Sequence, residues 1–201
     1  MQELVELGAR ARVCTDCRLS ESRTRVVFGV GRHDAQVMMV GEAPGRNEDL
    51  QGEPFVGAAG NLLNRLLAEV GMQREDVYIA NVLKCRPPNN RDPRPDEIAA
   101  CKGYLSRQLD LVDPTVVMTL GNFATQLLLR TTTGISRMRG RSYKWWRDKI
   151  LIPTFHPAAA LRGGDRVTDQ IREDLALMRS VLDSLDTGEG VEAEPEQLGL
   201  F

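Results

Sequence analysis

The sequence has no long apolar run, little net charge and only two histidines. No stretch approaches the ~20 consecutive apolar residues of a membrane span, so we expect no membrane-spanning segment. The first twelve residues, MQELVELGARAR, are a charged amphipathic run without the apolar core of a signal peptide. We therefore expect the protein to stay in the cytoplasm.

The net charge of −2 hides a difference between the body of the chain and its end. Such a small value argues against a partner held by bulk electrostatics. However, six acidic residues and no Lys or Arg follow from Asp183 onward, which leaves 22 acidic against 26 basic residues up to Leu182. The body then carries about +4, and nucleic acid remains a plausible partner.

Four short apolar runs, mostly bounded by turn residues, predict buried strands at 37–40, 77–80, 115–119 and 150–152. Helical patterns precede, separate and follow them, at 2–12, 61–70, 96–112, 123–129 and 167–185. Strands that alternate with helices indicate an α/β fold of three layers, α/β/α, around a central, mainly parallel four-stranded sheet. We expect one domain over residues 1–185 and a flexible acidic tail over 186–201.

The cysteines are four thiols in a chain without an export signal, which disfavours disulfides: Cys14, Cys17, Cys85 and Cys101. Four unrelated buried cysteines are an alternative, but the Cys-x2-Cys pair argues against it. Zinc and an iron-sulfur cluster both accept four thiolates, and spacing does not choose between them. Cys85 precedes Arg86-Pro87-Pro88, a rigid loop, whereas Cys101 falls on a predicted helix.

Unusual residues gather where the predicted strands end, which is where parallel sheets bind ligands. The turn Gly41–Gly45 follows the first strand and offers backbone N–H groups and the Glu42 carboxylate, although a purely structural turn has the same pattern. Phe55 lies between Pro and Val-Gly, as a core anchor or as a ring that stacks on a base. His156 follows the last strand, as a donor or as a satisfied structural histidine.

Several ordered pieces together resemble family 4 of the uracil-DNA glycosylase superfamily, the iron-sulfur-containing bacterial and archaeal enzymes. The pieces are GEAPG, PFVG, Asn81 ahead of VLKCRPP, His156-Pro-Ala and the four cysteines, and the resemblance spans residues 1–182. It implies hydrolysis of the N-glycosidic bond of uracil in DNA, as in base excision repair. It also implies that Cys14, Cys17, Cys85 and Cys101 bind a [4Fe-4S] cluster.

The resemblance further implies a uracil site made of Gly41, Glu42, Ala43, Glu48, Phe55, Asn81 and His156. In this likeness Phe55 stacks on the flipped base, Asn81 pairs with its O4 and N3–H edge, and His156 donates to O2. Glu48 lies at the C5 side and excludes the thymine methyl group.

Glu42 and His156 are the candidate catalytic residues. Negative charge builds on uracil O2 as the bond breaks, and a donor at His156 would stabilise it. A carboxylate would orient the attacking water. The better-known branch of the superfamily has an Asp where this chain has Ala43, so the role does not carry over by position; we choose Glu42, with Glu48 as the alternative.

Two departures from the family pattern concern the neighbouring loops. Arg46 and Asn47 stand where acidic residues are frequent in the family, which bears on phosphate contact near the site. A related branch traps DNA covalently through a histidine after the Cys-Arg-Pro-Pro loop, and residues 89–96 here contain none. Hydrolysis is therefore favoured over trapping.

Two further segments are candidates for DNA contact. By analogy, the loop after His156 enters the minor groove, with Leu161 as a wedge and Arg162 on a phosphate; the alternative is a plain loop with a helix-capping role. The basic aromatic segment 137–147 either contacts phosphates or, as we favour, forms a strand with Trp145 or Trp146 in the core.

The last residues, Gln197–Phe201, resemble the peptide by which bacterial repair proteins bind the sliding clamp. A tail that folds back on its own domain is the alternative. For the whole protein, which we expect to be a monomer acting on uracil-containing DNA, two other functions stay open. These are a glycosylase for another deaminated base such as hypoxanthine, and a non-catalytic binder of uracil-DNA.

Overall fold

The centre of the protein is a sheet built on the four predicted apolar runs. The computed structural model describes residues 1–188, 190 and 193–197, without the side chains of 194–197. The central strands are β2 (Val37–Gly41), β3 (Tyr78–Asn81), β4 (Val116–Leu120) and β6 (Lys149–Thr154). They lie parallel in the order β3-β2-β4-β6, and all their residues are buried. The prediction of a parallel four-stranded centre is confirmed.

Three edge strands that were not part of the predicted sheet extend it to seven. They are β1 (Val30–Gly31) beside β3, β5 (Tyr143–Trp145) beside β6, and β7 (Glu194–Gln197) beside β5. β1 and β5 are antiparallel to their neighbours. Trp145 of β5 is fully buried and donates its indole N–H to the Leu128 carbonyl at 3.0 Å. The basic aromatic segment therefore contains the strand that we favoured.

The end of the chain differs from the flexible tail expected over 186–201. The last helix continues to Thr187, and the backbone of Glu194–Gln197 pairs with β5 in parallel. An edge strand presents unpaired N–H and C=O groups, and a following segment of the same chain can satisfy them. Of the clamp-like peptide, only Gln197 lies within the described residues.

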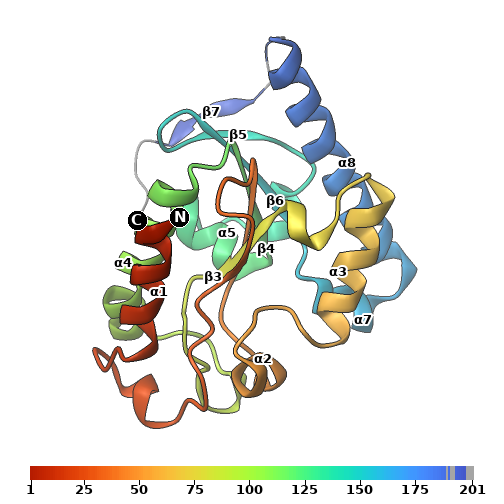
Figure 1. Cartoon of the computed structure of the whole chain (residues 1–201). Coiled ribbons are helices and arrows are strands. Elements are labelled where there is room, and N and C mark those ends of the chain that lie inside the picture. Colours follow the sequence, from red (N-terminus) through yellow and green to blue (C-terminus); the bar gives the residue numbers. More distant parts are fainter. Residues whose placement is uncertain (189, 191–192, 198–201) are drawn as a thin grey trace.

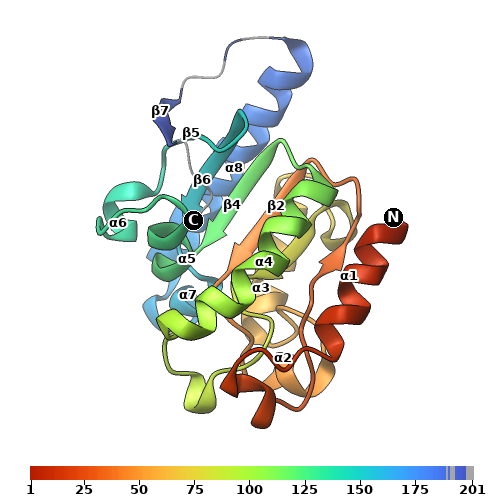
Figure 2. The same ribbon diagram turned by 90° about the vertical axis from the view of Figure 1, so that its left-hand side faces the viewer.

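Helices cover both faces of the sheet, which confirms the three-layer arrangement (Figures 1 and 2). α3 (Ala58–Glu69), α7 (Pro157–Gly163) and α8 (Asp165–Thr187) pack on the face that receives Val37 and Met39. α1 (Gln2–Arg12), α4 (Pro95–Val112) and α5 (Asn122–Leu128) lie on the other face, and α4 and α5 pack against Met38 and Val40. Alternate side chains of one strand thus enter opposite cores.

Short helices connect these elements: α2 (Arg46–Gln51), α6 (Ile135–Met138) and 3-10 turns at Arg18–Glu21, Arg74–Asp76 and Pro88–Asn90. α2 and the Pro88–Asn90 turn follow β2 and β3 at the carboxyl edge of the sheet. No helix in the described ranges has the length and apolar character needed to cross a membrane.

The segment after His156 is a helix, α7, and not the plain loop that stood as the alternative to a minor-groove contact. Pro157 occupies a first-turn position, where its missing N–H costs nothing, and three alanines with high helix propensity follow it. The helix therefore begins directly at the end of the histidine loop.

Candidate active site

Parallel pairing brings Asn81 beside the Gly41 turn. Gly41 and Asn81 are partners in the register of β2 and β3, so both strands end at the same point of the sheet edge. A Cβ atom on Gly41 would lie 2.3 Å from Asn81 Oδ1 and 3.0 Å from the Phe55 ring. Only glycine leaves room for this close approach.

Phe55 is held from three sides. Its backbone is in the left-handed region, with φ of 53°. Arg74 donates to the Pro54 carbonyl at 2.5 Å and to the Phe55 carbonyl at 3.2 Å. On the other side α3 approaches so closely that a Cβ atom on Gly60 would lie 1.8 Å from the Phe55 carbonyl oxygen. The ring itself stacks on the His156 ring, with centroids 5.3 Å apart and planes inclined by 27°.

His156 is a neutral hydrogen-bond donor in this environment. Its Nδ1 accepts the backbone N–H of Ala158 at 3.1 Å, which leaves the proton of the neutral ring on Nε2. Burial lowers its pKa to about 4; Arg162 acts in the same direction, and Glu48 opposes both. The imidazole therefore carries no charge near pH 7.

These side chains line one cavity of about 240 Å³ at the carboxyl edge of the sheet. Of the predicted uracil site it contains Glu42, Ala43, Glu48, Phe55, Asn81 and His156. Gly41 lies beneath, in contact range of Phe55 and Asn81. A second cavity, of about 440 Å³, shares Glu42, Ala43 and His156 with the first and adds Asp92, Asn122 and Arg162. The two cavities meet at the histidine and the Glu42 turn.

The two candidate carboxylates have different surroundings. Glu48 accepts the Val56 N–H at 3.1 Å and so ties α2 to the loop that carries Phe55. Glu42 has no hydrogen bond of its side chain to the rest of the described chain, and it borders both cavities. Burial, and secondarily Asp92, raises the pKa of Glu42. Glu42 is therefore the carboxylate that is free to bind a water.

The DNA-contact candidates on α7 lie just beyond His156. Leu161 is 52% exposed, and Arg162 borders the second cavity. About half of the Leu161 surface is therefore free to contact a partner.

Sequence reasoning did not single out the wall formed by the loop after β3. Pro87, Asn90 and Arg91 line the first cavity and Asp92 the second. Arg91 binds Glu97 of α4 through two hydrogen bonds of 2.5 and 2.9 Å, and this carboxylate is fully buried. The sequence feature that could have indicated these residues is their position in 81–91, after a predicted strand. This position marks a loop at the sheet edge but does not show which of its side chains line the cavity.

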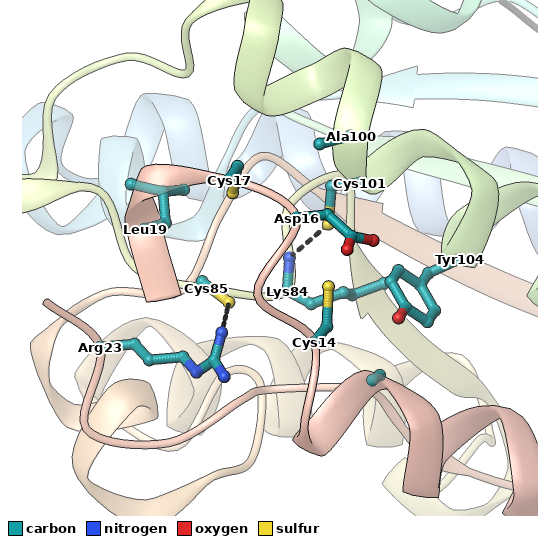
Figure 3. A pocket seen from close by; sticks show the side chains of 11 residues that line it. Cys14, Asp16, Cys17, Leu19, Arg23, Lys84, Cys85, Ala100, Cys101 and Tyr104 are labelled. Carbon is teal, nitrogen blue, oxygen red and sulfur yellow. Dashed lines mark hydrogen bonds between the residues drawn. The ribbon is translucent and has the colours of Figure 1, made fainter. Parts of the chain in front are cut away.

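All four cysteines line one cavity, which we call the cysteine cavity (Figure 3). Cys14 and Cys17 follow α1, Cys85 follows β3, and Cys101 lies on α4; all four are free thiols. Their sulfur atoms face the same space. The predicted helical position of Cys101 and the loop position of Cys85 are confirmed.

The donor set of this cavity, four thiols with N–H donors beside them, fits a metal-thiolate group by its chemistry, although not by the spacing of the side chains. The backbone N–H of Lys84 donates to Cys101 Sγ at 3.3 Å, and Arg23 donates to Cys85 Sγ at 3.4 Å; such donors stabilise sulfur ligands. Burial raises the pKa of the Cys101 thiol to about 11 and that of Cys85 as well, so these thiols become thiolates only beside a positive group. Within the described residues no three His, Cys, Asp or Glu side chains stand at metal-binding spacing.

Comparisons with known proteins agree with this fold. The family described as "Uracil DNA glycosylase superfamily" matches residues 28–176. The "Type-4 uracil-DNA glycosylase" of Archaeoglobus fulgidus is 49% identical over 168 residues, 80% of this chain and 84% of the relative. Those of Saccharolobus solfataricus and Thermotoga maritima are each 44% identical. They cover 92% and 90% of this chain, and 88% and 96% of their own lengths.

The chain therefore belongs to the uracil-DNA glycosylase superfamily, and within it to the type-4 family. This confirms the family that the sequence motifs resembled.

Proposed function

We propose that this protein excises uracil from DNA by hydrolysing its N-glycosidic bond, which leaves an abasic site for repair. The observation that carries the proposal is the single cavity that contains a stacking ring, an amide, a neutral histidine and a carboxylate. Uracil inside a duplex cannot be reached, so the base must be flipped into such a pocket at a cost of about a few kcal/mol. We further propose that it works on DNA in the cytoplasm and as a monomer.

In this proposal, different side chains of the cavity bind different parts of the uracil base. Phe55 stacks on the flipped uracil. The backbone of Phe55 is left-handed and hydrogen-bonded to Arg74, and it holds the phenyl ring beside His156. Asn81, which is 2% exposed and fixed at the end of β3, pairs with the O4 and N3–H edge. Glu48 lies at the C5 side, where the methyl group of thymine would meet it, and the backbone of Gly41, Glu42 and Ala43 contacts the base.

Bond cleavage needs stabilisation of a leaving anion and an oriented water. His156 donates from Nε2 to uracil O2 and, because it is neutral, it does so without giving up a proton. Glu42 orients the water, since Glu48 is already bonded to Val56. The carboxylate charge also offsets the positive charge that develops on the sugar.

We further infer that Cys14, Cys17, Cys85 and Cys101 hold a [4Fe-4S] cluster. Support comes from the four converging thiols, the N–H donors to two of them, and membership of the type-4 family. The group supplies a rigid cross-link between the α1 end, the β3 loop and α4, and takes no step in the hydrolysis. An anaerobic preparation tests this inference: it should contain iron and show a brown absorbance. Zinc without iron would refute the cluster.

Single-turnover cleavage of a uracil-containing duplex tests the function and the choice of carboxylate together. The parent should release free uracil and leave an alkali-labile abasic site, and Glu42→Gln should slow release by about 100-fold or more. Glu48→Gln should lose less. A near-normal rate in Glu42→Gln would exclude our assignment. Faster release of hypoxanthine would indicate another base specificity, and binding without release would indicate a non-catalytic binder.

The terminal peptide Gln197–Phe201 is proposed as a docking signal for the bacterial sliding clamp. Its support is its sequence and its position beyond an acidic segment, since burying Leu and Phe in a partner requires reach. Deletion of residues 197–201 should abolish clamp binding and leave uracil release unchanged. Binding that survives the deletion would refute the idea.

A further inference from the structure

Arg91 is a cation on the wall of the first cavity, and its neighbours fix it in place. Among the described residues that line this cavity it is the only Lys or Arg. Its guanidinium binds the Glu97 carboxylate through Nη1 at 2.9 Å and Nη2 at 2.5 Å, and the Glu97 side chain is fully buried. Nη1 also donates to the Asp92 carbonyl at 3.0 Å. The Arg91 side chain is itself 28% exposed, so part of it stays open to a ligand.

The loop that presents Arg91 is held in an uncommon conformation. Asn89 and Asn90, directly before it, both have a left-handed backbone, with φ of 57° and 53°. Arg86 donates from Nε to Asn90 Oδ1 at 2.7 Å across the loop. Left-handed residues other than glycine cost free energy and persist where the surrounding contacts impose them. These contacts therefore keep the Arg91 guanidinium at one place on the cavity wall.

Two donors of this guanidinium stay unused in the part of the chain that the structure describes. An arginine has five N–H donors, and the bonds to Glu97 and Asp92 take three of them, two on Nη1 and one on Nη2. The Nε–H and the second N–H of Nη2 are left. These two point in parallel from the same side of the planar group, and this arrangement matches two oxygens of a phosphate.

The first cavity otherwise presents negative groups to a DNA backbone. Glu42 and Glu48 line it as carboxylates, whereas the His156 ring is neutral. A nucleotide that is flipped into the cavity carries a phosphodiester group on each side of its sugar, and these groups follow the base toward the opening. Carboxylates repel such a group, and a cation on the wall offsets the repulsion. Arg91 is the described lining residue that supplies this cation.

We propose that Arg91 binds a phosphodiester group next to the flipped nucleotide through its Nε and Nη2 donors, and that Glu97 is the positioning residue that orients it. The proposal rests on the proposed function, since it takes uracil-containing DNA as the substrate. Because Glu97 already fixes the guanidinium, little side-chain freedom is lost when the phosphate binds. The contact is distinct from the one expected of Arg162, which borders the second cavity.

Equilibrium binding to a duplex that the enzyme cannot cleave tests the contact without turnover. The probe carries a uracil nucleotide with fluorine at C2′ of the sugar, which resists cleavage. Arg91→Gln should weaken binding by about 10-fold, as for the loss of one charge-assisted contact. The slope of log Kd against log salt should become shallower by about 1, because one phosphate is no longer neutralised.

Two further variants and a control define what the contact requires. Arg91→Lys should keep the salt slope, because it keeps the charge, and regain only part of the affinity, because it lacks the paired donors. Glu97→Gln should also keep the slope and lower the affinity by about 3-fold, since Arg91 stays charged but is less firmly held. Arg172→Gln is the matched control: Arg172 also pairs with a glutamate, Glu69 of α3, and the substitution should change neither quantity.

A change in the DNA shows which group Arg91 touches. A methylphosphonate removes the charge of one phosphodiester group and is placed in turn on the 5′ and the 3′ side of the uracil. With the parent protein, one of the two positions should weaken binding by about 10-fold. With Arg91→Gln the same position should cost little more, because the partner is already lost. Losses that add at both positions would show that Arg91 touches neither phosphate and would overturn the proposal.

Arg91→Gln leaves the buried Glu97 carboxylate without its partner, which destabilises the loop whatever the role of the arginine. The double variant Arg91→Gln/Glu97→Gln removes both charges and lets two amides bond each other. Its thermal midpoint should recover relative to Arg91→Gln, while its DNA affinity should stay as low as that of Arg91→Gln. A recovery of affinity to the parent value would show that Arg91 only braces the loop, contrary to the proposal.

The outcomes separate this proposal from the proposed function. A parent protein that binds the duplex but releases no uracil would refute the glycosylase function, while the salt slopes and the methylphosphonate series would still decide the role of Arg91. A parent that releases uracil, together with a salt slope that is unchanged in Arg91→Gln, would refute the Arg91 contact alone.

Discussion

Individual side chains at the first cavity, the proposed uracil site, acquire their chemistry from a few close neighbours. The N–H of Ala158 selects the His156 tautomer, and burial keeps the ring neutral with a pKa of about 4. This value lies below the pKa of about 6.5 of an unfolded histidine. The contribution of His156 to the stability of the fold is therefore complete above about pH 6.5, where the ring is neutral in both states. The contribution, at most about 3 kcal/mol, is lost as the pH falls toward 4.

The loss of activity at acid pH should follow the protonation of the Glu42 carboxylate. Its pKa is raised by burial and by Asp92, and only the ionised carboxylate can accept a proton from water. His156 stays neutral down to about pH 4, so the first loss of activity on acidification belongs to Glu42. Asp92→Asn removes one of the two causes, and the limb of kcat against pH should shift to lower pH.

Single-turnover rates measured across the acid range check this expectation. Asp34→Asn is a control, because Asp34 is bonded to Arg32 far from the cavity and should leave the limb in place. An acid limb that is identical in the parent and in Asp92→Asn would show that Asp92 does not act on the catalytic carboxylate.

At the scale of elements, short connections at the sheet edge position the chemistry. The α2 turn, the loop after β3 and the start of α7 each follow a central strand, and parallel strands end at the same edge. α7 begins one residue after His156, so the helix holds both the histidine backbone and the exposed Leu161. A wedge on a helix is more firmly positioned than one on a loop.

Leu161→Ala should separate opening of the duplex from cleavage of the bond. Without a wedge, uracil release from duplex DNA should fall by about 10-fold, since a loss of 1.4 kcal/mol in flipping is a factor of ten. Release from single strands should not change, because no stack needs to be opened there. The thermal midpoint should stay within about 2 °C, because the side chain is half exposed.

A leucine elsewhere gives the control for this measurement. Leu185, which is 37% exposed near the end of α8, should tolerate alanine with either substrate. Equal losses on duplex and single-stranded DNA in Leu161→Ala would mean that Leu161 does not act as a wedge.

At the scale of the whole molecule, the helices are attached to the rest of the protein by different means. The two cores on either side of the sheet hold α3, α4, α5 and α8 through many fully buried side chains. α1 buries only Leu7, Gly8 and Ala11, so its attachment depends more on the cysteines that follow it. The group that we propose for the four cysteines should therefore matter most for the N-terminal part of the chain.

Removal of that group should loosen one region and leave the rest folded. Hydrogen exchange after anaerobic chelation should become at least about 10-fold faster in residues 2–24 and 84–101, because local opening there loses its cross-link. The central strands β2, β4 and β6 should keep their protection. Uniform acceleration over the whole sheet would instead show that the group holds the entire fold, and no change would show that it holds neither part.

The sequence alone determined the class of fold and most of the predicted site residues that line the first cavity. Apolar runs such as VMMV at Val37–Val40 are too short for buried helices and too apolar for solvent, so they specify the parallel centre. Glycine at Gly41, and the motif residues Asn81 and His156, could be assigned because each follows such a run. The four cysteines could be grouped from the sequence because a Cys-x2-Cys pair has few structural explanations.

Only the tertiary structure decided which edge strands complete the sheet and which side chains face one another. β5 and β7 pair through backbone groups, which every sequence possesses, so their pairing leaves little trace in the residues. The hydrogen bond from Arg74 to the Phe55 carbonyl joins two segments through a backbone oxygen, which side-chain patterns do not reveal. The sequence had already favoured Glu42 over Glu48, but the structural support for that choice is a single backbone N–H, that of Val56, which binds Glu48. Side-chain chemistry is local to the sequence, but the partners that tune it are brought together by the packing of distant segments.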